Sequence, residues 1–335
     1  MNIVDIQDLK KSFAATAVLD GLSFSVAPGE VYGLLGPNGS GKTTTINILC
    51  NLLAADAGSA RVMGIAAGEE TKRLIGFAPQ EISIYRDLSC AENLDFFARL
   101  NGLSPARRRE RVAELIDAFH LAAYANVCVG NLSGGWQRRI NIAVALVHAP
   151  RLLVLDEPTA ALDIEARYEL WQLIRQLNTS GTAILLTTHH LQEAELLCSR
   201  IGIVREGRIA AEGSLAQLRA SIPAQQLAVV ESSDEEAVCA RARGWQLRRY
   251  GGKPTLWLPR AFTLAELVGV FDGIDVSSMT LSPVGLEHVY LEVTAAAAAP
   301  RPDTGLSVGS RRHSGLIAGA RPALAAGCAS ASTAD

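Results

Sequence analysis

Residues 36–43, with the sequence GPNGSGKT, decide the fold of this chain. They match the pattern GxxxxGK[ST], follow an apolar strand-like run at 30–35, and precede a helical pattern at 44–53. In such a loop the glycines let the backbone wrap around phosphate oxygens, and the amino end of the next helix faces the anion. The sequence therefore predicts a nucleotide-phosphate site between this strand and this helix.

We expect the whole loop and the residue after it to hold the phosphates of a nucleotide. Lys42 would meet the β and γ phosphates, and the Thr43 hydroxyl would bind magnesium. The predicted nucleotide-binding residues of this loop are Gly36, Pro37, Asn38, Gly39, Ser40, Gly41, Lys42, Thr43 and Thr44. Kinases, GTPases and many other nucleoside triphosphatases share such loops, so the loop alone does not choose among them.

Two further apolar strands end in polar residues that belong beside this loop. The run 152–155 leads into Asp156 and Glu157, and the run 183–186 is followed shortly by His189. Sheets of α/β proteins bind ligands at the carboxyl ends of their strands. We predict that Asp156 holds magnesium, that Glu157 polarises the attacking water, and that His189 bonds the γ-phosphate and that water.

Four further segments resemble motifs of one family. Residues 132–135 (LSGG) lie just upstream of a helical pattern at 138–147 and resemble the signature of the ATP-binding-cassette (ABC) ATPases, which other phosphate-loop proteins lack. Gln80 in FAPQ resembles the family's Q-loop, Asp163 in ALD resembles its D-loop, and Phe13 is placed like its adenine-stacking aromatic residue. These motifs follow the family's order across about residues 3–215.

The resemblance implies an α/β fold with a P-loop NTPase (RecA-like) core and an ABC helical subdomain, and ATP and Mg²⁺ as cofactors. The implied catalytic residues are Lys42, Gln80, Glu157 and His189. The implied metal ligands are Thr43, Gln80 and Asp156, and the nucleotide contacts outside the loop are Phe13, Ser133, Gly134 and Gly135. In the family the signature contacts ATP bound to the other subunit, which predicts a homodimer that closes head to tail.

One residue departs from the family pattern. Where the family usually has Gln after Ser-Gly-Gly, this chain has Trp136. The serine and the backbone amides are unchanged, so we expect catalysis to persist and only the fine geometry or coupling at Trp136 to differ. Simple packing of Trp136 against the partner subunit is an equal alternative.

Alternating strand-like and helical patterns predict a largely parallel sheet in the first part of the chain. We expect an ABC ATPase domain at 1–217, with a nearly all-helical subdomain at about 88–149. A small C-terminal α/β accessory domain at 218–294 would have its strands at 227–230, 255–258 and 276–281. The tail 295–335 opens with alanines and continues with Pro, Gly, Ser and Arg, a composition that predicts disorder.

Composition excludes several classes of function. The formal net charge of -3 provides no basic field for nucleic acid, so we expect no nucleic-acid partner. No apolar run approaches the roughly 18 residues of a membrane-spanning helix, and the first residues lack the apolar stretch of a signal peptide. The six cysteines form no CxxC pair, which favours unpaired thiols in a reducing compartment.

Residues 286–291 (LEHVYL) resemble the closing segment of ATPases that serve ABC-2 type exporters, such as drug-resistance and glycolipid or polysaccharide export systems. This resemblance implies an ABC-2 type transmembrane permease as partner and a location at the cytoplasmic face of the cell membrane. The alternatives are a soluble ABC ATPase acting on ribosomes or DNA, and a non-hydrolysing scaffold. A single cassette without sustained heptads disfavours the first, and the intact Lys42, Glu157 and His189 disfavour the second. The cargo is not encoded here.

Overall fold

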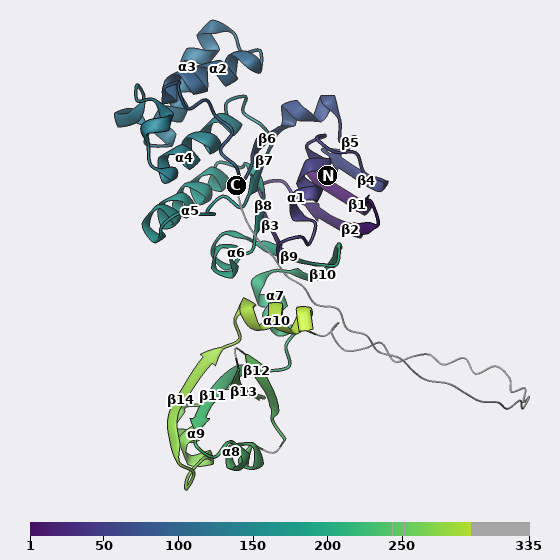
Figure 1. Ribbon diagram of the computed structural model, residues 1–335, viewed down its shortest axis with the longest axis vertical. Helices are drawn as coiled ribbons and strands as arrows, with labels where there is room; N and C mark the ends of the chain where they lie inside the picture. Colours follow the sequence, from purple (N-terminus) through teal and green to yellow (C-terminus); the bar gives the residue numbers. More distant parts are fainter. Residues whose placement is uncertain (243, 251, 296–335) are drawn as a thin grey trace, which may run out of the picture. The chain divides into compact units, whose positions relative to one another are not determined.

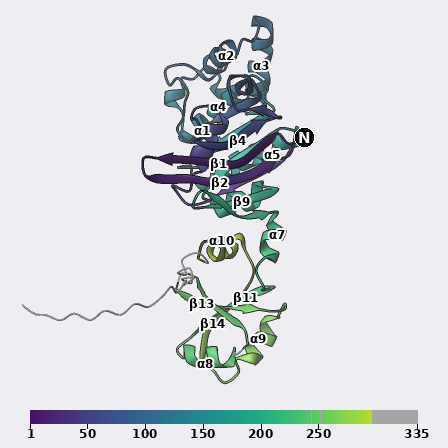
Figure 2. The ribbon, with the colours of Figure 1, turned by 90° about the vertical axis from the view of Figure 1, so that its right-hand side faces the viewer.

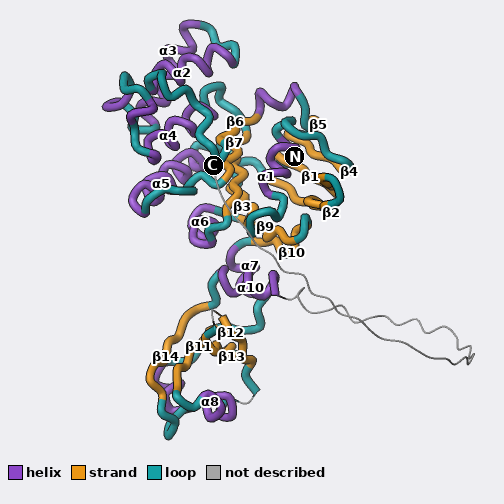
Figure 3. Tube along the Cα trace, viewed as in Figure 1, coloured by secondary structure: helices purple, strands orange, loops and turns teal. Residues whose placement is uncertain are grey.

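Two β-sheets form the first part of the molecule in the computed structural model, which describes residues 1–242, 244–250 and 252–295. One sheet contains β1 (Val4–Phe13), β2 (Thr16–Val26), β4 (Ala57–Val62) and β5 (Ile65–Ala66) in the order β2-β1-β4-β5. The other contains β3 (Val31–Leu35), β6 (Ile75–Ala78), β7 (Leu152–Asp156), β8 (Ala183–Thr188), β9 (Arg200–Arg205) and β10 (Arg208–Gly213). Its order is β10-β9-β3-β8-β7-β6, and Figure 3 shows both groups of strands.

The six-stranded sheet is parallel except for its antiparallel edge strand β10. Every residue of β3, β7 and β8 is buried, because both faces of the sheet are covered. Within β7, Leu153 and Leu155 belong to one apolar core, and the alternating Leu152 and Val154 belong to another. This arrangement explains why the strands that carry the site residues are continuous apolar runs.

The helices of this part are α1 (Lys42–Leu49), α2 (Cys90–Leu100), α3 (Pro105–Ala118), α4 (Gly134–Ala145), α5 (Ile164–Thr179), α6 (Leu191–Leu197) and α7 (Leu215–Ala220), with short 3-10 helices at Glu69–Leu74, Ala122–Tyr124 and Val129–Asn131. Figure 1 shows α4, α5 and α6 on one face of the six-stranded sheet, and α1 with the four-stranded sheet on the other. Figure 2, a view of the molecule turned by 90°, shows β1, β2 and β4 side by side. No helix among the described residues is long and apolar enough to cross a bilayer.

The segment 88–149 is less helical than we predicted. It contains α2, α3 and α4, but residues 119–133 form short 3-10 helices, turns and an isolated β-bridge from Cys128 to Ser89. Their backbone groups bond instead to the segment 86–91: the Ala91 N–H donates to the Ala125 carbonyl at 2.9 Å, and the Val129 N–H donates to the Leu88 carbonyl at 2.9 Å. A backbone whose hydrogen bonds are satisfied by a distant segment has no need of a helix.

The boundaries of two predicted helices also shift. The helix after the phosphate loop runs from Lys42 to Leu49 rather than over 44–53, and Asn51 beyond it adopts a positive φ of 55°. The helix expected at 138–147 is α4, which begins earlier, at Gly134, and ends at Ala145. This earlier start brings two glycines of the signature into the first turn of the helix.

A third, antiparallel sheet follows, in the order β12-β13-β11-β14. Its elements are β11 (Gln226–Ser232), α8 (Glu235–Arg241), β12 (Gln246–Tyr250), β13 (Lys253–Leu258), α9 (Leu264–Val270), β14 (Val276–Pro283) and α10 (Leu286–Ala295). The three predicted strands are present, but β12 was missed because it is a polar edge strand without a buried residue. The domain boundaries stay a prediction. Residue 295 ends α10, and the rest of the segment predicted to be disordered, 296–335, lies outside the described residues.

Candidate active site

The phosphate loop connects β3 to α1, as the sequence predicts. Within it, Gly39 and Gly41 adopt positive φ angles of 80° and 102°, which favour glycine. A Cβ atom on Gly41 would also lie 2.5 Å from the Cδ2 atom of Leu19, so this position has no room for a side chain. At Gly39 and Gly41 the loop therefore follows a backbone path that residues with side chains rarely adopt.

Lys42 places a buried ammonium group at this loop. Its Nζ atom donates to the carbonyl oxygens of Gly36 at 2.8 Å and Pro37 at 3.1 Å, and lies 3.9 Å from Glu157 Oε1. Burial lowers the pKa of Lys42, while the carboxylates of Glu157 and Asp156 act to raise it. A buried cation that is held mainly by carbonyl groups is well suited to a phosphate anion.

Asp156 and Thr43 form a pair of oxygen ligands. The Thr43 hydroxyl donates to Asp156 Oδ2 at 3.1 Å. On the neighbouring parallel strand, Thr187 lies opposite Asp156 in the register and donates its hydroxyl to Asp156 Oδ1. A carboxylate and a hydroxyl are the hard oxygen donors that Mg²⁺ prefers, so these residues fit the metal implied by the sequence.

Glu157 has a backbone conformation that is unusual for a residue with a side chain, with a φ of 46°. Its N–H donates to the Thr187 carbonyl at 3.1 Å, which holds this turn against β8. Its Oε1 atom lies 3.0 Å from His189 Nδ1. Because a carboxylate only accepts, Nδ1 carries the hydrogen in this bond, and the Nε2 atom of His189 is left for a ligand.

One cavity of about 410 Å³ gathers much of the predicted site. Its lining residues are Val18, Asn38, Gly39, Gly41, Lys42, Thr43, Thr44, Gln80 and Glu157. Val18, on β2, was not predicted, since a lone valine carries no signal in the sequence. Phe13 does not line this cavity: its side chain is exposed at the end of β1, with Lys11 Nζ 5.7 Å from the ring centre.

The backbone around Gln80 is held by α4, a connection that the sequence analysis missed. The guanidinium of Arg138 donates to the carbonyls of Pro79, at 2.7 Å, and Gln80, and the Ser83 N–H donates to Asn141 Oδ1 at 3.3 Å. Arg138 and Asn141 are both buried, and burial lowers the pKa of Arg138. The available signal was Asn141, a polar residue within the otherwise apolar stretch 140–147.

The signature lies at the start of α4 and lines a different, smaller cavity of about 130 Å³. Ser133 precedes the helix at its N-cap, Gly134 begins it, and Ser133 and Gly135 share the cavity with Asp163. Lys42 does not line this cavity, and Ser133 does not line that of Lys42. Within one chain, the two predicted halves of the nucleotide site are therefore not brought together.

Trp136 packs within its own chain. The guanidinium of Arg139 lies 4.5 Å from the centre of the Trp136 ring, and the Tyr124 ring lies 4.4 Å from it on centroids. Arg139 in turn pairs with Glu169 of α5 at 2.5 Å. Trp136 therefore has packing partners within its own chain, and together with Arg139 and Glu169 it lines the same cavity as Ser133 and Gly135.

Comparison with known proteins agrees with this geometry. Residues 19–160 match the family described as ABC transporter. The daunorubicin/doxorubicin resistance ATP-binding protein DrrA of Streptomyces peucetius is 37% identical over 87% of this chain and 92% of its own length. The Nod factor export ATP-binding protein I of Paraburkholderia xenovorans is 43% identical over 65% of this chain and 73% of its own length.

A solved structure shows the same fold. A dimeric, post-hydrolysis ATP-binding cassette bound to ADP and Pi, MJ0796, superposes with a TM-score of 0.58 at 28% identity, over 63% of this chain and 98% of its own length. The site described above, the matched family and the near full-length relative point to one conclusion. This chain belongs to the ATP-binding subunits of ABC transporters and is an ATPase.

Proposed function

We propose that this chain, acting as a homodimer at the cytoplasmic face of the membrane, drives export through a separate ABC-2 type permease. The observation that carries the proposal is the position of Glu157, 3.9 Å from Lys42 and 3.0 Å from His189, in a chain similar to a drug-resistance ATP-binding protein over most of its length. The names of these relatives refer to drug resistance and Nod factor export, which supports an exporter.

The hydrolytic roles follow from the contacts of each side chain. Lys42 binds the β and γ phosphates and offsets charge that develops during phosphoryl transfer. Glu157 accepts a hydrogen bond from the attacking water, and its contact with His189 keeps both side chains directed at the same point. Thr43, Gln80 and Asp156 would hold Mg²⁺, which when bound neutralises phosphate charge. Phe13, exposed at the end of β1, would stack on the adenine.

Two copies of the chain complete each nucleotide site. The cavity of Lys42 and the cavity of Ser133 are separate within one chain, so the signature of a second copy must supply Ser133, Gly134 and Gly135. The dimeric state of the similar cassette supports this arrangement. Each γ-phosphate then gathers charge-assisted hydrogen bonds from both subunits, and hydrolysis removes the link that holds them together.

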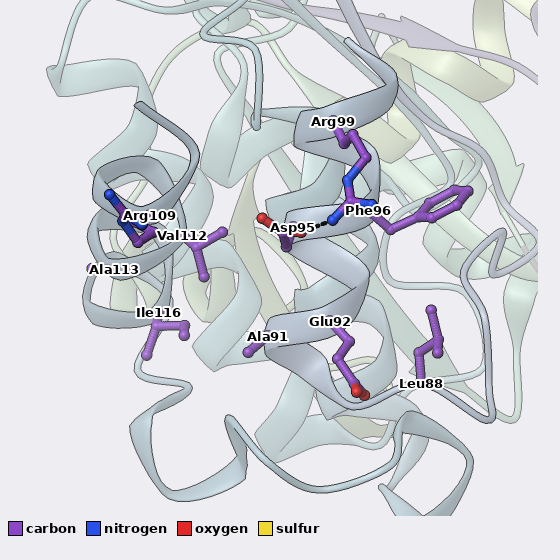
Figure 4. Close-up of a pocket in the computed structure, with 10 residues that line it drawn as sticks. All are labelled: Leu88, Ala91, Glu92, Asp95, Phe96, Arg99, Arg109, Val112, Ala113 and Ile116. Atoms are coloured by element: carbon purple, nitrogen blue, oxygen red, sulfur yellow. Dashed lines mark hydrogen bonds and ion pairs between the residues drawn. The ribbon is translucent and has the colours of Figure 1, made fainter. Parts of the chain in front are cut away.

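We assign the permease contact to a groove between α2 and α3, with a volume of about 620 Å³. Figure 4 shows Val112 of α3 directed toward Asp95 of α2, and Ala113, Ile116 and Ala91 also line the groove. At the charged rim of this groove, Arg99 forms an ion pair with Asp95 at 3.2 Å. A largely apolar groove with a charged rim fits the apolar face of a short helix with polar flanks, such as a cytoplasmic loop of a permease.

Membrane fractionation tests the proposed function. The chain is expected to sediment with membranes when its permease is produced in the same cells and to remain in the supernatant otherwise. Val112→Asp, which puts a charge into the groove, should reduce this recruitment about tenfold while ATPase activity persists. Ala106→Asp, on the first turn of α3 outside the groove, is the matched control. Permease-independent sedimentation with ribosomes would instead favour the soluble ABC ATPase.

A further inference from the structure

Glu193 of α6 is a buried carboxylate that has no place in the chemistry described above. Its exposed fraction is 0%, and no described Lys, Arg or His forms an ion pair with it. Its Oε1 atom accepts two hydrogen bonds, from Thr159 Oγ1 at 2.9 Å and from Trp171 Nε1 at 3.1 Å. Burying a carboxyl group without a cation beside it costs free energy, and the hydrogen bonds from these two donors offset part of that cost.

Glu193 lies between the two turns that carry Glu157 and His189. Thr159 follows Glu157 by two residues, and the turn between them is closed by a bond from the Ala160 N–H to the Glu157 carbonyl at 3.1 Å. On the other side, α6 begins two residues after His189. The bond between Thr159 and Glu193 therefore joins the backbone after Glu157 to the helix after His189.

We propose that Glu193 is a positioning residue for ATP hydrolysis, holding the turn after Glu157 in register with the His189 end of β8. The proposal rests on the proposed roles of Glu157 and His189, whose side chains approach to 3.0 Å. Burial raises the pKa of Glu193, in keeping with a group that acts through hydrogen bonds rather than through charge. Phosphate binding by Lys42 does not depend on this contact.

The two donors allow positioning to be separated from packing, because they reach the same oxygen from different elements. Thr159 belongs to the turn after Glu157, whereas Trp171 belongs to α5. If Glu193 positions the turn, loss of the Thr159 hydroxyl must affect the chemical step. Loss of the Trp171 N–H removes a bond to the same Glu193 oxygen but leaves the turn attached.

The test compares steady-state ATPase kinetics and melting temperatures of full-length variants. Thr159→Val is expected to lower kcat about tenfold or more, with KM for ATP within about twofold. Trp171→Phe is expected to lower the melting temperature and leave kcat within about twofold. Glu193→Gln retains an oxygen acceptor for both donors and should keep most of the wild-type kcat, whereas Glu193→Leu should match Thr159→Val.

The kcat values of the two donor variants decide the matter. Equal loss of kcat in Thr159→Val and Trp171→Phe, or no loss in either, overturns the proposal. Should Glu193→Leu not fold, the pair of donor variants still decides it. Glu157→Gln measured beside them separates the two proposals: if it hydrolyses ATP normally, the proposed site is wrong, and if it is inactive while Thr159→Val is normal, only the role of Glu193 is wrong.

Discussion

The substitution Thr187→Val gives the sharpest quantitative test of the proposed magnesium ligand Asp156. The Thr187 hydroxyl donates to Asp156 Oδ1 and also accepts from the Glu157 N–H at 3.2 Å. Valine has nearly the same shape, so the substitution removes these two bonds without opening a cavity. The Glu157 N–H keeps its bond to the Thr187 carbonyl at 3.1 Å, so the main loss falls on Asp156.

The expected magnitude follows from the bond to a buried carboxylate. A hydrogen bond to a charged group contributes about 1.5–3 kcal/mol, and Asp156 is only 2% exposed, so water replaces little of it. At roughly 2–4 °C per kcal/mol for a domain of this size, the melting temperature should fall by about 3–12 °C. With its Oδ1 atom no longer held, Asp156 should bind Mg²⁺ about tenfold more weakly, which corresponds to about 1.4 kcal/mol.

Thermal melting and the Mg²⁺ dependence of ATPase activity measure these effects. The matched control is Thr71→Val, since Thr71 is also fully buried and its hydroxyl bonds only to the backbone of Gly68, at 2.9 and 3.0 Å. The control should lose only about 0.5–1.5 kcal/mol of stability and keep the wild-type Mg²⁺ dependence. A Thr187→Val protein with unchanged melting temperature and Mg²⁺ dependence would refute the reasoning.

Three other predictions concern the chemistry, the dimer and the thiols. Glu157→Gln should bind ATP but lower kcat by about 10²–10⁴-fold and accumulate as a dimer in light scattering, because the attacking water is not activated; a monomer at saturating ATP contradicts this. Lys42→Ala and Ser133→Arg should each be inactive alone and should regain activity when mixed, because one of the two sites in the mixed dimer is intact. If mixed dimers form but stay inactive, the prediction that one intact shared site is enough for hydrolysis is wrong. An alkylating probe should label the exposed Cys128 well before the buried Cys50, whose pKa burial raises to about 12; mass spectrometry of the native protein shows the order, and equal rates contradict it.

Much of the candidate site could be predicted because its signals are local. The phosphate loop needs glycine at positions with positive φ, such as Gly39 and Gly41, and so leaves a spacing that is visible in the sequence. Parallel strands buried on both faces are continuous apolar runs, and the residues just beyond them, Asp156, Glu157 and His189, stand out by contrast. The α/β class and the ABC family were readable for the same reason.

Other features depended on contacts between distant segments. The segment 119–133 forms no α-helix because part of its backbone bonds to residues 86–91, and no local pattern in the sequence indicates such a partner. Arg138 reads as one more basic residue of a helix until the fold places the carbonyls of Pro79 and Gln80 against it. The groups that contact a polar side chain are decided only when the chain has folded.

The sequence by itself therefore determined the class of fold and the family, and it supplied the proposed phosphate-binding residues. Only the tertiary structure decided that Ser133 lines a different cavity from Lys42, and that Glu193 is buried against Thr159 and Trp171. The physical reason is that a tight loop needs glycine at particular positions and a buried strand needs consecutive apolar residues. Both requirements act on neighbouring residues, so both are visible in the sequence. A hydrogen bond between residues more than 30 positions apart leaves no such pattern, because either partner alone is an ordinary polar residue.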